Sequence, residues 1–152
     1  MPEIVRIIFL VLMSIAGLVA SMNISTLSRS SQYLKEDLEI AVHDASIASL
    51  DLQQLSNGNI VFDPVSAEQV FRESFELNTG LEQTDYAVVD FKIFDESNST
   101  FPVEYEPSHL DFRDTFTNPT IVAVIETTTN KYFFGAKQET VRRVAAYTYQ
   151  VR

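Results

Sequence analysis

The side chains best suited to catalysis or metal binding in this sequence are two histidines and a few nearby carboxylates. His43 lies in a predicted helix, and His109 lies in a loop with Asp111 and Asp114. Carboxylates beside an imidazole can act in hydrolysis or hold a cation, but two histidines without a shared spacing do not make a metal site. A solvated acidic loop explains the residues around His109 more simply. We therefore expect no catalytic residue and no bound metal.

Other chemical patterns are absent or weak. The stretch DESNST at 95–100 offers oxygen ligands but lacks the spacing of a calcium-binding loop, and it indicates an exposed hairpin connection. The sequence has no cysteine, which excludes disulfides and thiol catalysis, and it has no glycine-rich phosphate loop. We therefore predict that the protein is not an enzyme and has no cofactor and no small-molecule substrate.

The distribution of charge argues against nucleic acid as a partner. The chain has 152 residues and a net charge of −10. Residues 36–130 hold nineteen acidic and three basic residues, whereas residues 131–152 hold five basic residues and one acidic residue. An acidic domain repels phosphate backbones. Four of the late basic residues could either neutralise their own sheet or meet the acidic helix of another copy: Lys131, Lys137, Arg142 and Arg143.

The elements that would position a site begin with the apolar segment VRIIFLVLMSIAGLVASMN at residues 5–23. As a helix, residues 4–22 would rise about 28 Å, close to the ~30 Å hydrocarbon core of a bilayer. Arg6 and the terminal amine would then place the N-terminus in the cytoplasm and residues 23–152 outside it. The alternative is a secretory signal cleaved at VAS (19–21), but the apolar run exceeds the ~7–15 residues usual for such a signal. We therefore expect a membrane anchor that stays attached.

A long amphipathic helix is predicted to follow this segment. No proline or glycine occurs between Gly17 and Gly58, and the Ser/Thr-rich residues 23–32 are the expected place for a break. One apolar ridge recurs at steps of three and four residues: Ile24, Leu27, Leu34, Leu38, Ala41, Ala45, Ala48, Leu52 and Leu55. A second ridge consists of Ile40, Ile47 and Leu50. Two ridges require two partners, namely the protein's own domain and a neighbouring copy, unless the helix is sunk in its own core.

Aspartates at heptad spacing separate the two ridges: Asp37, Asp44 and Asp51. After them, residues 56–64 supply a helix-ending turn and one short strand. Residues 66–80 then form a predicted second helix with a capping box of Ser66 and Gln69 and a stop at Gly80.

Beyond Gly80 the periodicity of apolar residues changes to two. Strands are predicted at 86–94, 120–129 and 140–151, and residues 101–107 could add an edge strand. The expected fold class is α+β, with a long N-terminal membrane-plus-stem helix packed on a small antiparallel β-sheet head that carries one extra helix. The predicted regions are a transmembrane anchor or assembly helix (1–22), an amphipathic stem helix (23–57) and an extracytoplasmic head (58–152).

This order of elements resembles the pilin-like superfamily, most of all the TadE-like minor pilins and pseudopilins of tight-adherence systems. The resemblance covers the whole chain as an architecture, and it rests on the segments IVRIIFLVLMSIAGLVAS, LEIAVHDASIASLDL, VAVIETTT and ETVRRVAAYTY. It implies a structural subunit or minor component of a surface filament or secretion apparatus. The implied partners are the membrane and other copies or related pilin-like subunits. It also implies that Glu3 is the acidic residue that pairs with a neighbour's N-terminus.

The residues expected at subunit contacts are Glu3, small residues that let helices approach closely, and the alanine-bearing ridge. The small residues are Ala16, Gly17 and Ala20, and the ridge residues are Leu38, Ala41, Ala45, Ala48 and Leu52. The alternative hypothesis is a monomeric, membrane-anchored extracytoplasmic domain that binds a ligand or a larger complex. An apolar ridge left exposed on the outer helix would favour the first hypothesis.

Overall fold

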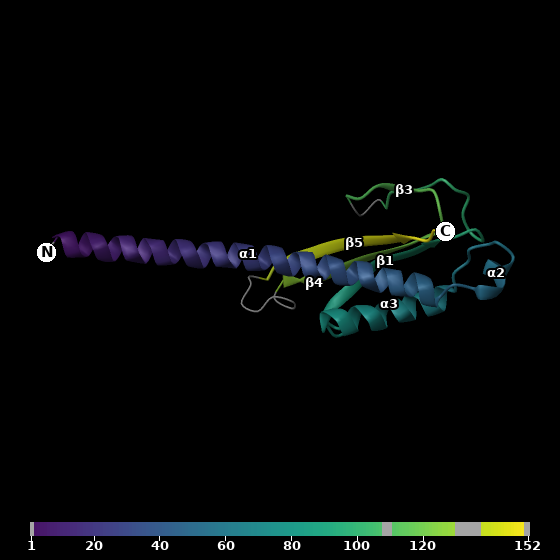
Figure 1. The fold of residues 1–152 in the computed structure, drawn as a ribbon, viewed down its shortest axis with the longest axis horizontal. Coiled ribbons are helices and arrows are strands. Elements are labelled where there is room, and N and C mark those ends of the chain that lie inside the picture. Colours follow the sequence, from purple (N-terminus) through teal and green to yellow (C-terminus); the bar gives the residue numbers. More distant parts are fainter. Residues whose placement is uncertain (1, 108–110, 130–137, 151–152) are drawn as a thin grey trace. The chain divides into compact units, whose positions relative to one another are not determined.

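The structure, a computed structural model, describes residues 2–107, 111–129 and 138–150, and it describes side chains for residues 3–18 and from residue 32 onward within those ranges. Three helices and five strands are named in it (Figure 1). In chain order they are α1 (Pro2–Ala48), α2 (Leu52–Ser56), α3 (Pro64–Thr79), β1 (Tyr86–Phe94), β2 (Val103–Tyr105), β3 (Asp114–Phe116), β4 (Thr120–Thr128) and β5 (Thr140–Thr148). The chain divides into two compact units, Met1–Tyr33 and Leu34–Arg152.

Helix α1 runs without a break from Pro2 to Ala48, so residues 23–32 do not interrupt it. In its first unit every large apolar side chain from Ile4 to Leu18 is exposed, each by between 52% and 66%. Among the residues whose side chains are described, no helix is both long and apolar enough to cross a membrane. The side chains of residues 19–22, the end of the predicted span, lie outside the described part.

Helix α1 ends at Ala48, whereas the predicted stem helix continues to residue 57. The N–H and Oγ of Ser49 both donate to the carbonyl of Ala45, at 3.1 and 2.6 Å. The next residues leave the helix, because Leu50 pairs with Phe62 in an antiparallel bridge. Asp51 is extended, with ψ of 102°, and its carboxylate caps α2. The predicted stem is therefore two helices, and the predicted short strand is a single bridge.

Helix α3 begins two residues before the predicted start. Asp63 is its N-cap, accepting from the N–H groups of Val65 and Ser66, and Pro64 occupies the first turn. Ser66 therefore lies inside the helix, and the predicted capping box is wrong, because the aspartate before the proline takes that role. The predicted stop is confirmed, since Gly80 adopts the left-handed conformation with φ of 70°.

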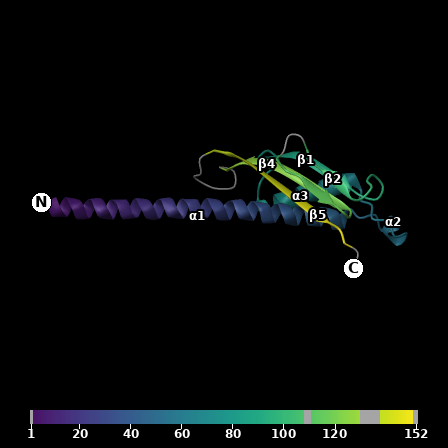
Figure 2. The same ribbon diagram turned by 90° about the horizontal axis from the view of Figure 1, so that it is seen from above.

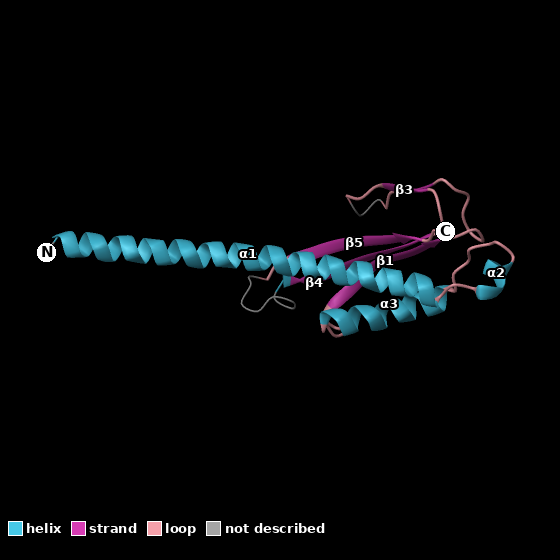
Figure 3. Cartoon of the chain, viewed as in Figure 1, coloured by secondary structure: helices cyan, strands magenta, loops and turns pink. Residues whose placement is uncertain are grey.

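The main sheet is antiparallel in the order β1-β4-β5, which confirms the α+β class (Figure 3). Its register aligns Phe91 with Ala123 and Ala123 with Ala145. Strand β4 lies in the middle, and residues 120–125 of it are buried, because both faces of the sheet are covered. The edge strands β1 and β5 are mostly half-buried.

Alternate residues of β4 contribute to two different hydrophobic clusters. Ile121, Ala123 and Ile125 join the main core with residues of α1 and α3. Val122 joins a smaller cluster with Tyr105 of β2 and Phe116 of β3. The helices therefore cover one face of the sheet, and the β2–β3 hairpin packs on the other.

The expected edge strand at 101–107 is wrong as a part of the main sheet. Strand β2 pairs only with β3, in a separate two-stranded antiparallel sheet. The reason is its aromatic content, because the Tyr105 ring packs edge-on against Phe94 of β1 and lies parallel to Phe116 of β3. These contacts hold the hairpin on the face of the main sheet opposite the helices.

Candidate interaction surface

The second unit presents a layer of two helices, formed by α1 from Leu34 onward and α3, which lie side by side (Figure 1). Figure 2 shows the strands of the main sheet lying along this end of α1. We call the exposed side of this layer the outer helical surface. Its main residues on α1 are Ile40 and Ile47, with the acidic neighbours Glu36, Asp37, Glu39 and Asp44.

The structure corrects the predicted use of the alanine-bearing ridge. Leu38, Ala41 and Ala45 have no exposed surface and belong to the core that includes β4. Side chains buried under their own sheet cannot contact a second subunit, so the assembly role predicted for these three residues is wrong. The physical reason is that these three residues fall on one face of α1, which packs into a single core with Ile121, Ala123 and Ile125 of β4.

The other predicted assembly residues are dispersed along the chain. Ala48 is exposed at the last position of α1, and Leu52 is 74% exposed at the start of α2. Glu3, Ala16 and Gly17 are exposed in the first unit, whereas the side chain of Ala20 lies outside the described residues. The structure therefore does not gather the predicted assembly residues into one patch.

The second predicted ridge is the one that stays open. Ile40 is 45% exposed and Ile47 is 53% exposed, while Leu50 is half-buried against the main core. On α3, Leu77 is 83% exposed and Val65 is 77% exposed. On α1, the described residues thus leave about half of the side chains of Ile40 and Ile47 uncovered.

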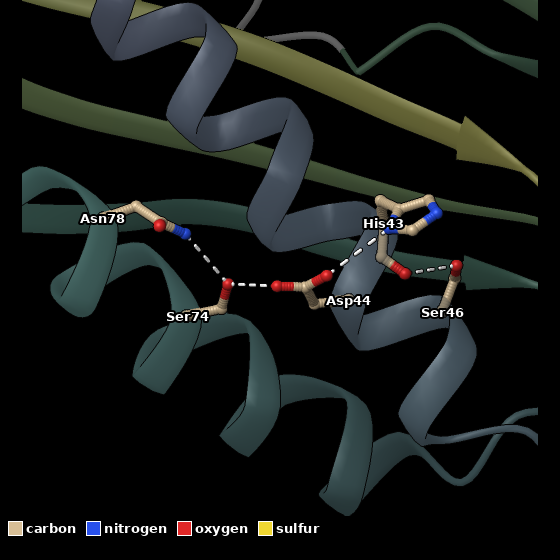
Figure 4. Close-up of polar contacts among 5 residues, drawn as sticks. All are labelled: His43, Asp44, Ser46, Ser74 and Asn78. Carbon is tan, nitrogen blue, oxygen red and sulfur yellow. Dashed lines mark hydrogen bonds and ion pairs between the residues drawn. The ribbon is translucent and has the colours of Figure 1, made fainter.

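A group of polar side chains connects α1 to α3 by hydrogen bonds (Figure 4). The hydroxyl of Ser74 donates to Asp44 Oδ2 at 2.6 Å and accepts from Asn78 Nδ2 at 3.2 Å. The other carboxylate oxygen of Asp44 lies 3.4 Å from His43 Nδ1. Ser46 is buried and donates to the carbonyl of His43 at 2.7 Å. These contacts fix the side-by-side placement of the two helices.

The geometry of this group does not match a nucleophilic triad. In such a triad the serine hydroxyl is hydrogen-bonded to the imidazole, which accepts its proton. Here the Ser74 hydroxyl donates to the carboxylate of Asp44, and the His43 ring packs edge-on against Tyr147 with centroids 4.7 Å apart. The group therefore acts as a structural link between helices.

A second polar centre lies where the sequence indicated an exposed hairpin connection. Asp95 is only 1% exposed, so that prediction is wrong for this residue. Its carboxylate accepts from the Phe62 N–H at 3.0 Å and from the N–H and hydroxyl of Ser97 at 2.9 and 2.6 Å. Beside it, Glu96 accepts from the Ile60 N–H at 2.7 Å. The turn after β1 thereby fastens the chain that leads into α3.

Two tyrosines also donate hydrogen bonds to carboxylates. The hydroxyl of Tyr86 donates to Glu76 at 2.9 Å, and burial, with this carboxylate nearby, raises the pKa of Tyr86 to about 12. The hydroxyl of Tyr105 donates to Asp90 at 2.7 Å, and burial followed by the same kind of neighbour raises its pKa further. Both hydroxyls therefore stay protonated donors at neutral pH.

The remaining sequence candidates do not assemble into a site. Asp111 and Asp114 are exposed, and His109 lies outside the described residues. In the described ranges, no group of three or more histidine and carboxylate side chains could hold a metal ion. An open depression on the surface of α3 is lined by Val65, Glu68 and Arg72 among other residues of that helix.

A residue of the basic C-terminal segment neutralises a carboxylate of its own sheet. Arg142 of β5 bonds to Glu126 of β4 through Nε at 3.1 Å and Nη2 at 2.5 Å. This is one of the two roles that the sequence left open. Lys131 and Lys137 lie outside the described residues.

Comparison of the chain with protein-family models, with curated proteins and with solved structures finds no match.

Proposed function

We propose that the chain is a structural subunit or minor component of a pilus-like surface filament or secretion apparatus that assembles through its N-terminal helix. The observation that carries the proposal is that the two ends of α1 have different surroundings. One continuous helix exposes its large apolar side chains at residues 4–18, and its last turns are built into the core of an α+β unit. A helix that is apolar all round requires lipid or protein around it.

In this proposal, residues 4–22 anchor the chain in a membrane, the N-terminus is cytoplasmic and residues 23–152 lie outside. Each of the eleven large apolar side chains between Ile4 and Leu18 is more than half exposed. At about 1.5–3 kcal/mol for full burial of such a side chain, and with a little over half of each one exposed, leaving this set in water forgoes roughly 10–19 kcal/mol. That is comparable to or greater than the ~5–15 kcal/mol net stability of a typical domain. A lipid or protein environment removes that cost.

The subunit contact in the proposal uses the outer helical surface and not the alanine-bearing ridge. Leu38, Ala41 and Ala45 are committed to the core of the second unit. Ile40 and Ile47 lie one heptad apart on the same helix and are about half exposed. Residues at that spacing fall on one helical face, which is the pattern for contact with another helix.

The test is site-specific photo-crosslinking of the full chain in membranes of its host. A benzoylphenylalanine introduced at Ile40 or Ile47 is expected to yield a discrete adduct, identified by mass spectrometry as this chain or as another subunit with an apolar N-terminal helix. Thr115 of β3, exposed on the hairpin, is the matched control position and should yield none. A cell fractionation that finds the chain outside the membrane, or absence of adducts at both isoleucines, would refute the proposal and leave a monomeric domain.

A further inference from the structure

We infer that the outer helical surface recognises a basic amphipathic helix of a non-identical subunit, and not a second copy of itself. This inference rests on the proposed function, because it names the partner of the same surface. It depends on two properties of the described residues: the spacing of the exposed aliphatic side chains, and the imbalance of charge around them.

The spacing fits a helical partner. Ile40 and Ile47 are separated by two helical turns, a rise of about 10.5 Å, and fall within about 20° of each other around the helix axis. Each is about half exposed, so each can gain further burial against an apolar side chain of a partner. A partner helix with apolar residues at the same heptad spacing would meet both isoleucines at once.

The charge around these two isoleucines is strongly acidic. Along α1 from Leu34 onward there are four carboxylates against one cation, a net charge of −3 from 1 − 4 with histidine neutral. The carboxylates are Glu36, Asp37, Glu39 and Asp44. The cation is Lys35, which lies 3.4 Å from Glu39 and so already has a carboxylate partner on its own helix.

The carboxylates beside the isoleucines are crowded. The pKa of Asp37 is raised, first by partial burial and then by repulsion from Glu36. A lysine or arginine of a partner placed between the two carboxylates would reverse the second effect. Two identical surfaces in contact would instead bring a net charge of −3 on one α1 against −3 on the other, and like-charge juxtaposition costs several kcal/mol in an interface. Complementarity therefore selects a partner helix that is rich in lysine or arginine beside its apolar ridge.

The test uses the full chain in non-ionic detergent micelles with benzoylphenylalanine at Ile47, and at Thr115 as the control position. The probes are two synthetic helical peptides of two heptads each, with identical leucine ridges, one carrying lysine and the other glutamate at every flanking position. We expect the lysine peptide to give about tenfold more adduct at position 47 than at 115, and about tenfold more than the glutamate peptide gives at 47. These ratios correspond to about 1.4 kcal/mol.

A matched pair of variants separates charge recognition from adhesion of the leucine ridge. Glu36→Gln with Glu39→Gln should lower the adduct with the lysine peptide about fivefold. Glu104→Gln with Glu106→Gln, which neutralises two exposed carboxylates of the hairpin region, should leave it unchanged. Equal adducts with both peptides, equal adducts at both positions, or no effect of the first pair would overturn the inference.

The two proposals fail in different ways. If position 47 in host membranes crosslinks to a second copy, giving an adduct of about twice 17.2 kDa, the proposed function gains support and the inference is overturned. If the lysine peptide binds selectively but host membranes show no subunit adduct, the surface preference stands and the proposed function fails.

Discussion

The substitution of leucine for alanine at two positions of α1 tests the division of the predicted alanine-bearing ridge. Ala45 has no exposed surface and lies in the main core, whereas Ala48, three residues later, is exposed at the end of the helix. Ala45→Leu and Ala48→Leu make the same chemical change in the same helix. They therefore differ mainly in burial.

The expected magnitudes follow from that difference. Leucine adds three carbon atoms, which would contribute about 2.4 kcal/mol if they were buried without strain, at ~0.8 kcal/mol per methylene. The core around Ala45 is filled by Leu38, Ala41 and Ile121, each fully buried, so the added atoms have no space. Overpacking of this kind destabilises by about 1–3 kcal/mol net. Ala48→Leu should stay within about 0.5 kcal/mol, as is usual for exposed positions.

The assay is guanidinium unfolding of the full chain in detergent micelles, followed by tyrosine fluorescence. The sequence has no tryptophan, and Tyr86 and Tyr105 are 7% and 6% exposed, so the tyrosine signal reports on the head. Equal stability of the Ala45→Leu variant and the natural chain would show that Ala45 does not pack under its own sheet. That result, together with a loss of subunit crosslinking in the variant, would restore the alanine-bearing ridge as the subunit contact.

Three further predictions concern polar contacts. Asp63→Ala should lower the free energy of unfolding by about 1 kcal/mol through loss of the cap on α3, whereas Ser66→Ala should change it by less than about 0.5 kcal/mol; thermal unfolding of the two variants checks this. Asp95→Ala should cost several kcal/mol, because three donors lose a buried acceptor at about 1–3 kcal/mol each, and incomplete folding by circular dichroism would agree with this. The raised pKa of Tyr86 stabilises the fold fully below about pH 10, its usual value, and this contribution declines as the pH rises toward about 12. Stability measured between those limits should therefore fall less steeply in Tyr86→Phe than in the natural chain, and parallel curves would contradict the assignment.

Local patterns in the sequence were enough to predict most of the elements of this fold. The alternation of β-branched and aromatic residues predicts strands at 86–94 and 120–129, which the structure has at Tyr86–Phe94 and Thr120–Thr128. Gly80 ends α3 because only a residue without a side chain adopts its backbone conformation cheaply. The end of α1 was not predictable in this way. It depends on the bridge between Leu50 and Phe62, which competes with continued helix only once residues 61–63 have come alongside.

The hydrogen bonds of Asp44 and Asp95 could not be predicted from the sequence for a related reason. The hydrogen bond from Ser74 to Asp44 joins residues 30 apart, and the one from Phe62 to Asp95 joins residues 33 apart. Asp44 was noted for its heptad spacing and Asp95 for its place in a turn, but neither pattern names a partner. Only the packing of α1 against α3, and of the turn after β1 against the loop before α3, brings the donors to these carboxylates.

By itself, the sequence determined that the second half of α1 has two apolar ridges separated by aspartates, because helical periodicity is a property of the chain alone. Only the tertiary structure decided which ridge is buried. The hydrophobicity of the two ridges does not settle the choice, since the isoleucines of the exposed ridge are more apolar than the alanines of the buried one. The packing decides it, because Leu38, Ala41 and Ala45 are fully buried in one core with Ile121, Ala123 and Ile125 of β4, whereas Ile40 and Ile47 lie outside that core.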